Sequence, residues 1–232
     1  MKTIKRIFLF LFIILIIVST AIISSGYTKY KEALEELPLV DAVASIKSID
    51  NYTKINDVPE MYKNAVIATE DRRFEYHNGF DMVGAVRAII VDIKKKELAE
   101  GGSTITQQLA KNMYFQSDNT PSRKIAEIFM ALEIENQYSK DEIFEFYMNV
   151  IYFGSGYYNI YDAAVGYFEK KPSQMDDYES TLLAGVPNAP SVYSPKVNPD
   201  LAKKRQQKVI DCLVDCEYIT KEDGDKILSQ KE

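Results

Sequence analysis

The strongest constraint on this chain is an uncharged run near its N-terminus. Residues Ile7–Thr28 carry no charged side chain, and the first half is almost entirely Ile, Leu, Phe and Val. As an α-helix the run would rise about 33 Å, enough to cross the hydrocarbon core of a bilayer. Three of the six preceding residues are basic, and basic flanks stay in the cytoplasm. We therefore expect residues 1–6 to be a cytoplasmic tail and residues 7–28 a single-pass transmembrane anchor in the cell membrane.

A cleaved signal peptide is the alternative interpretation of the same run. The apolar region of a signal peptide usually spans only about 7–15 residues before a small-residue cleavage site. Here the apolar stretch Ile7–Ile23 is longer, and Ser24–Gly26 is a weak cleavage site. These features favour a retained anchor with the remaining chain outside the cell.

The composition beyond the anchor excludes several classes of protein. Residues 29–232 hold 25 of the 28 basic residues and all 34 acidic ones, so their net charge is −9. A broad nucleic-acid-binding surface is therefore not expected. One His excludes a multi-histidine metal site, and two Cys exclude a disulfide-framework miniprotein.

Past the anchor, the sequence predicts a stalk or linker over residues 29–56. Lys29–Leu37 is charged and favours helix, whereas Pro38–Asn56 mixes β-branched and polar residues and indicates a weak strand or loop. From Asp57 onward, apolar residues recur with helical spacing and no repeat is visible. We predict one mainly α domain over residues 57–232.

The first helix of that domain ends in a carboxylate. We expect it to begin near Asp57, with Glu60 completing an acidic variant of a capping box, and to run to Glu70. The helix macrodipole and partial burial would both raise the pKa of Glu70, which suits a general base. Alternatively, Glu70 is a surface residue at a frayed helix end.

A second informative stretch follows Gly101 and Gly102. Thr104 and Gln107 have capping-box spacing, and helical geometry places Thr104, Gln108 and Lys111 on one side of the helix. The helix N-terminus and the lysine could hold phosphate oxygens. The alternative is an ordinary capped amphipathic helix with a solvated polar face.

A third stretch begins at Thr120 and Pro121, which fit the start of a helix. This helix is apolar on two sides, and Glu127 lies where a charge is costly unless it is paired. Arg123, four residues earlier, is the obvious partner. A purely structural ion pair is the alternative interpretation.

Together these stretches resemble the motifs of the peptidoglycan glycosyltransferases of family 51, in the family's order over about residues 55–215. The first motif is matched by Glu70, Asp71, Phe74, His77, Gly79 and Asp81; the second by Gly101 or Gly102 through Gln108; the third by Arg123, Lys124 and Glu127; the fourth by Lys140, Ile143, Glu145, Tyr147, Met148, Asn149 and Gly154. The fifth motif matches at Arg205 and Val209, but Gln206 and Ile210 replace the family's Arg and Leu.

The resemblance implies a lysozyme-like, all-helical catalytic domain on the outer face of the membrane. Such enzymes polymerise lipid II into β-1,4-linked glycan, with inversion and release of undecaprenyl diphosphate. It further implies contact with membrane lipid and with cell-wall partners that include a transpeptidase, because the sequence holds no Ser-x-x-Lys or Lys-Thr-Gly motif. No organic cofactor and no nucleic-acid partner are expected.

The chemistry of this reaction suggests a role for each candidate. A carboxylate should take the proton of the attacking sugar hydroxyl, and Glu70 is the candidate. The departing diphosphate needs cations or N–H donors, which Lys111, Arg123, Lys124 and the helix after Gly102 would supply. Glu127 would orient Arg123 or help to hold a divalent cation, Mg²⁺ or Mn²⁺. The remaining expected substrate-binding residues are Asp71, Phe74, His77, Thr104 and Gln108.

Two rival functions remain open from the sequence. A lytic enzyme of lysozyme type would cleave the same glycan, but hydrolysis needs no cradle for diphosphate. A non-catalytic scaffold for wall synthesis is opposed by the presence of both Glu70 and Glu127. One segment, Asp81–Ala99, is either a core helix or a mobile, partly membrane-dipping helix with lysines at the headgroups.

Overall fold

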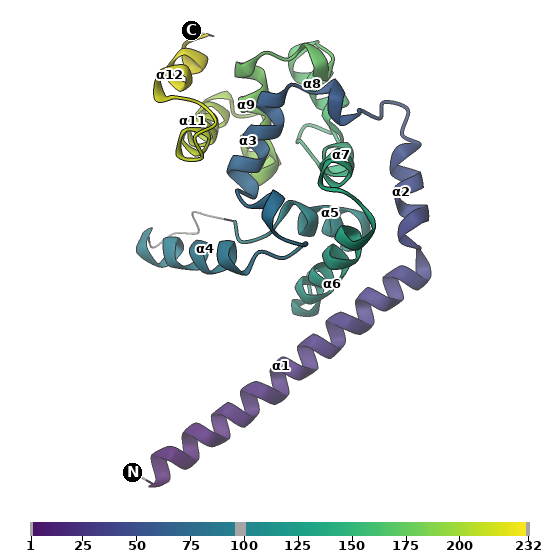
Figure 1. Ribbon diagram of the computed structural model, residues 1–232, viewed down its shortest axis with the longest axis vertical. Helices are drawn as coiled ribbons and strands as arrows, with labels where there is room; N and C mark the ends of the chain where they lie inside the picture. Colours follow the sequence, from purple (N-terminus) through teal and green to yellow (C-terminus); the bar gives the residue numbers. More distant parts are fainter. Residues whose placement is uncertain (1, 96–100, 231–232) are drawn as a thin grey trace.

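The computed structural model describes residues 2–95 and 101–230, and side chains for residues 4–88 and 101–230. Every secondary-structure element among the described residues is a helix, which confirms the mainly α fold class (Figure 1). The α-helices are α1 Lys2–Glu36, α2 Leu39–Lys47, α3 Glu60–Glu70, α4 Met82–Lys95, α5 Ile105–Tyr114, α6 Pro121–Gln137, α7 Lys140–Val150, α8 Ile160–Phe168, α9 Asp177–Gly185, α10 Pro190–Tyr193, α11 Pro199–Asp215 and α12 Lys221–Ser229. Short 3-10 helices lie at Ile55–Asp57, Phe74–Tyr76, Pro172–Gln174 and Val186–Asn188.

The uncharged run and the charged segment after it form one continuous helix, α1. Its N-terminal part projects away from the rest of the molecule (Figure 1). Among the described residues, Ile4–Glu36 is one helix long and apolar enough to cross a membrane. Its C-terminal part packs on α6, where the ring of Tyr27 meets the ring of Phe129 edge to face at 5.2 Å. Residues 29–36 of the expected stalk thus belong to a helix that contacts α6.

Leu39–Lys47 departs from the strand or loop expected for residues 38–56, whereas residues 48–54 are turn and loop as expected. Leu39, Val43 and Ile46 lie on one face of α2 and are buried, so their spacing is helical although Val43 and Ile46 are β-branched. Local strand propensity was misleading here, because packing on the core decides the state of a short segment.

The helix that carries Glu70 begins later than expected. Asp57 ends a 3-10 helix, Pro59 is the N-cap of α3, and no side-chain cap forms. The expected capping box at Asp57 is therefore wrong, while the end of the helix at Glu70 is confirmed. The capping box at Thr104 forms as expected, and a second capping box forms at Ser139.

Two groups of helices frame the site. α3, α9 and α11 pack together, and α9 is buried along almost its whole length. α5 packs against both α6 and α7. Gly185 lets α11 approach α9 closely, because a Cβ there would lie 3.0 Å from Cγ of Arg205. The groups meet where α3 ends and α5 begins.

Candidate active site

A cavity of about 350 Å³ lies where the end of α3, α5, α6 and the segment after α9 meet. It is lined by Glu70, Gly101, Ser103, Gln107, Gln108, Lys111, Arg123, Lys124, Glu127, Pro187 and Asn188. Six of the ten residues that the sequence singled out therefore share one cavity. In particular, the Glu70 carboxylate and Lys111 line the same space.

Glu70 lies at the C-terminal end of α3, with its side chain only 10% exposed. Nε2 of Gln108 donates a hydrogen bond to Oε2 of Glu70 at 2.8 Å. Burial raises the pKa of the Glu70 carboxyl; the hydrogen bond from Gln108 and the charge of Arg205 lower it, and Asp71 raises it. The net direction is upward, as a general base for neutral pH requires.

Gln108 is itself oriented by a neighbouring helix. The hydroxyl of Tyr147 on α7 donates to Oε1 of Gln108 at 3.4 Å. With its oxygen engaged there, the carboxamide presents its NH₂ group to Glu70. The amide thus holds one carboxylate oxygen in place and leaves the other, Oε1, without a hydrogen bond among the described residues.

Arg205 on α11 is the residue that the sequence analysis missed. Its Nη2 lies 3.6 Å from Oε1 of Glu70, and its guanidinium lies over the ring of Tyr193 at 5.8 Å. The available signal was its match to the fifth motif, which assigned it no role. The ion pair could not be predicted from spacing because Arg205 and Glu70 lie far apart in the sequence.

The three charged residues of the third motif form one cluster on α6. Glu127 is 1% exposed, and its Oε1 accepts a hydrogen bond from Nη1 of Arg123. Its Oε2 lies 3.1 Å from Nζ of Lys124. Lys124 also donates to Oγ of Ser103 at 2.6 Å, which ties α6 to the loop before α5. With two cations and one carboxylate, the cluster gives the wall of the cavity a net positive charge.

Lys111 is the other cation of the cavity. It is exposed, and within the described part of the chain it forms no ion pair. Its ammonium group is therefore open to an anionic ligand in the cavity.

The four remaining candidates lie behind the cavity wall. Nε2 of His77 lies 2.9 Å from Oδ2 of Asp71, and the same oxygen accepts a hydrogen bond from the backbone N–H of Ile105 at 3.0 Å. Thr104 donates to the Gly79 carbonyl at 2.7 Å. Together with the fully buried Phe74, they hold the start of α5 against the end of α3. Their role as substrate contacts stays a prediction.

The start of α5 offers fewer N–H groups to a phosphate than expected. The N–H groups there were expected to hold phosphate, but three already have partners within the protein. The backbone N–H of Thr104 binds Gln107, that of Ile105 binds Asp71, and that of Gln107 binds Thr104. The carboxylate of Asp71 occupies the place at the helix terminus where an anionic ligand would bind.

The described residues provide few candidate ligands for a metal ion. Across the described residues, no group of three or more His, Cys, Asp or Glu side chains is placed to hold an ion. Both oxygens of Glu127 already face cations. The Mg²⁺ or Mn²⁺ expected at Glu127 stays a prediction, and no step below depends on it.

Comparison with known proteins identifies a family for this chain. The transglycosylase family model matches residues 40–214. A candidate transglycosylase of Cupriavidus necator is 39% identical over 196 residues, which cover 84% of each chain. Penicillin-binding protein 1A of Neisseria lactamica and of Neisseria gonorrhoeae are each 43% identical over 180 residues. That match covers 78% of this chain but only 23% of theirs.

A solved structure is also similar in part. The crystal structure of penicillin-binding protein 1A from Haemophilus influenzae aligns with a TM-score of 0.39 and 25% identity, over 55% of this chain and 16% of that one. The family assignment depends on the sequence matches alone. On these matches, the chain belongs to the transglycosylase family of enzymes.

Proposed function

We propose that this protein polymerises lipid II into β-1,4-linked glycan by a single inverting displacement. The observation that carries the proposal is the shared cavity, in which a buried carboxylate of raised pKa faces a set of cations. A sugar hydroxyl needs a base, and a diphosphate leaving group needs positive charge. The cavity contains both.

Glu70 would act on the acceptor. Its carboxylate takes the proton of the 4-hydroxyl of lipid II while that oxygen attacks the anomeric carbon of the growing chain. Gln108 and Arg205 hold the carboxylate in place from two sides. Because the attack and the departure occur on opposite faces of the sugar, the configuration inverts.

The cations would act on the donor. As the bond between the anomeric carbon and the diphosphate oxygen breaks, the electron pair stays with the diphosphate. Lys111 and the positive α6 cluster can stabilise this growing charge electrostatically. Glu127 keeps the Arg123 and Lys124 side chains in position and is a positioning residue in this scheme.

The lytic alternative is less consistent with the same cavity. A glycosidase acid must give its proton to a departing sugar oxygen, and a raised pKa at Glu70 would also suit that role. However, hydrolysis of glycan releases no diphosphate, so Lys111 and the α6 cluster would have no anionic partner. The cations therefore favour the transferase.

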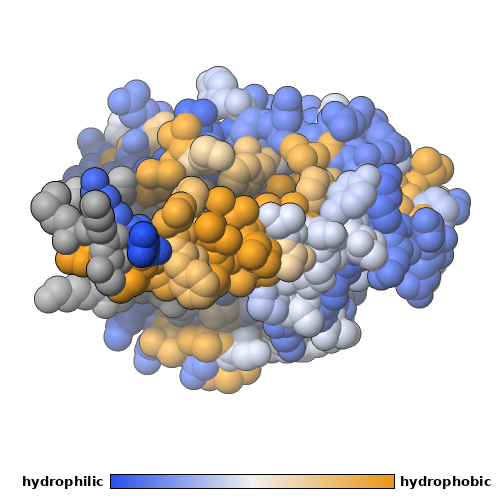
Figure 2. Space-filling view, turned by 90° about the horizontal axis from the view of Figure 1, so that it is seen from below, coloured by the Kyte–Doolittle hydropathy of each residue, from blue (hydrophilic) through white to orange (hydrophobic). Residues whose placement is uncertain are grey.

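The apolar surfaces support action at a membrane. Figure 2 views the molecule from below, toward the projecting end of α1, and shows apolar side chains gathered in the centre and at the left of this face. Besides the exposed apolar residues of α1, α4 also exposes three apolar side chains, Met82, Val83 and Val86. We propose that α1 anchors the protein with its N-terminus in the cytoplasm, and that transpeptidases and other cell-wall proteins act beside it.

The decisive test is polymerisation of purified lipid II by the full chain in detergent. Glu70→Gln should lower the rate by about 10²–10⁴-fold, and Lys111→Gln should also slow it, while the exposed Lys208→Gln should not. Full activity of Glu70→Gln would refute the base assignment. Shortening of preformed glycan without polymerisation would show the lytic enzyme instead.

A further inference from the structure

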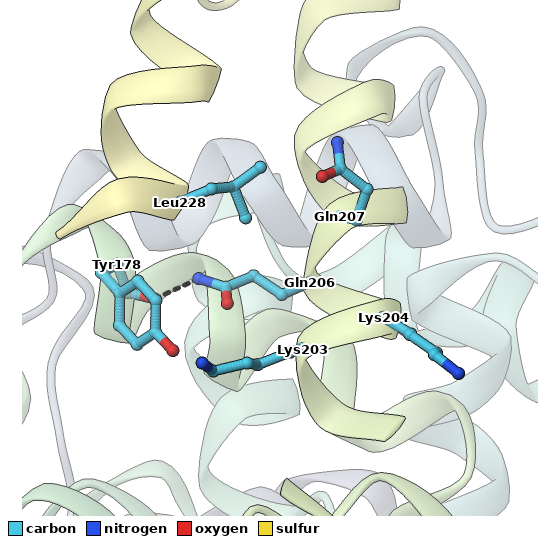
Figure 3. Close-up of a pocket in the computed structure, with 6 residues that line it drawn as sticks. All are labelled: Tyr178, Lys203, Lys204, Gln206, Gln207 and Leu228. Atoms are coloured by element: carbon cyan, nitrogen blue, oxygen red, sulfur yellow. Dashed lines mark hydrogen bonds between the residues drawn. The ribbon is translucent and has the colours of Figure 1, made fainter. Parts of the chain in front are cut away.

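A second cavity, also of about 350 Å³, lies where α9, α11 and α12 meet (Figure 3). Its walls are Tyr178, Lys203, Lys204, Gln206, Gln207 and Leu228, none of which lines the Glu70 cavity. No role proposed above uses these side chains. The cavity is large enough to hold a small organic ligand.

Gln206 provides a buried acceptor in this cavity. Its residue exposure is 0%, and its Nε2 donates to the Tyr178 carbonyl at 2.9 Å and to Oγ1 of Thr181 at 3.0 Å. The hydroxyl of Thr181 itself donates to the carbonyl of Asp177, so it must accept from Gln206. These two acceptors fix the carboxamide orientation, since the flipped amide would set oxygen against oxygen.

The other atom of the carboxamide is consequently unpaired. Oε1 of Gln206 is buried and has no hydrogen-bond partner among the described residues. Buried acceptors without partners are rare in folded proteins. In Figure 3 this oxygen points away from the bonded Tyr178 carbonyl, on the side of α11 where the Lys203 side chain lies. A ligand with an N–H group could satisfy it.

The lysines of the cavity also lack partners. Within the described part of the chain, neither Lys203 nor Lys204 forms an ion pair, although the protein as a whole is acidic. Lys203 extends toward Tyr178, whereas Lys204 extends to the opposite side of α11 (Figure 3). Leu228 of α12 adds an apolar side chain to the wall. The cavity therefore combines positive charge, one buried acceptor and an apolar contact.

We propose that this cavity binds a short peptide through a free carboxylate. The carboxylate pairs with Lys203, a backbone N–H of the peptide donates to Oε1 of Gln206, and an aliphatic side chain packs on Leu228. Inorganic phosphate would pair with Lys203 but would leave most of the volume and the Leu228 contact unused. The proposal does not depend on the chemistry assigned to Glu70.

Direct binding to the full chain in detergent tests this proposal. The probe is an N-acetylated alanine tripeptide with a free C-terminal carboxylate, titrated by calorimetry beside its C-terminal amide. We expect the acid to bind at least tenfold more tightly than the amide. Equal binding of the two peptides, or no binding of either, would overturn the proposal. Displacement of the acid peptide by equimolar phosphate or by anionic lipid vesicles would also overturn it, because the site would then recognise anions in general.

Variants separate the lysines from the amide. Lys203→Gln should weaken binding of the acid peptide about tenfold, whereas Lys208→Gln, on the same helix but outside the cavity, should leave it unchanged. Gln206→Arg keeps donors for the Tyr178 carbonyl but removes the acceptor, so binding should again weaken, with circular dichroism checking the fold. Unchanged affinity in both cavity variants would refute the proposal. Glu70→Gln should bind the peptide normally, which keeps this test independent of polymerisation.

Discussion

Replacing Arg205 tests how the Glu70 carboxylate is kept ionised. The guanidinium lies 3.6 Å from the carboxylate, and both side chains are largely buried. At an effective dielectric of about 20, such a pair interacts by about 5 kcal/mol at 3.6 Å. If water entering the vacated space offsets about half of this, ~2 kcal/mol remains, which is about 30-fold in proton affinity.

The sign of the effect follows from the charge. Because Arg205 lowers the pKa of Glu70, Arg205→Met should raise that pKa and leave the base protonated at higher pH. The acid limb of the rate profile for lipid II polymerisation should then move to higher pH. At a fixed pH on that limb the rate should fall about 30-fold, and the profiles should converge under alkaline conditions.

Initial rates measured from about pH 5 to pH 9 would show the displacement. Arg205→Lys keeps the charge and should keep the limb close to its original place, and Lys208→Met is the control on the same helix. If Arg205→Met lowers the rate equally at every pH, the reasoning is refuted, and Arg205 acts on packing or on the substrate instead.

Three further predictions concern stability and the membrane. Glu70→Gln should raise the melting temperature at pH 7 by roughly 2–4 °C for each kcal/mol by which it relieves the cost of burying the charge. The reason is that a protein loses stability as pH rises when folding raises the pKa of one of its carboxyl groups. Thermal melts followed by circular dichroism should show that the gain vanishes at acid pH, and a gain that persists there would contradict this. Gly26→Leu should separate α1 from α6 and slow polymerisation, since an added Cβ would lie 2.5 Å from Cβ of Ile125. Overpacking of this kind costs about 1–3 kcal/mol of stability. Ser25→Leu, at an exposed position, is the control, and equal polymerisation rates in the two variants would contradict the packing of α1 on α6. The chain has no Trp, so Val83→Trp, at a position 59% exposed, provides a single tryptophan fluorophore. Its emission should shift to the blue when lipid vesicles are added, whereas that of the control Tyr218→Trp should not. An emission spectrum of Val83→Trp that lipid leaves unchanged would refute insertion of α4.

The local parts of the site were predictable. The capping boxes at Thr104 and Ser139, and the pairing of Glu127 with Arg123, involve residues three or four positions apart. Such contacts form within one helix, so residue type and spacing are enough to predict them. The position of Glu70 at a helix end follows from the same kind of local pattern.

Local patterns failed where a distant partner decides the outcome. α2 was expected as strand or loop because its β-branched residues favour strand, whereas burial of one helical face determined its state. The start of α5 was expected to bind phosphate, but the carboxylate of Asp71, at the end of α3, accepts a hydrogen bond from the backbone N–H of Ile105 there. Arg205 pairs with Glu70 only because α11 packs against α3.

The sequence by itself determined the helical class, the apolar N-terminal helix, and the carboxylate and cations from which a transglycosylase site can be built. The tertiary structure alone decided which of these groups meet. It placed Glu70, Lys111 and the α6 cluster around one cavity and put His77 and Asp71 behind its wall. The reason is physical: side-chain type and short-range spacing are written in neighbouring residues, while burial and the distance between charges depend on how separate helices pack.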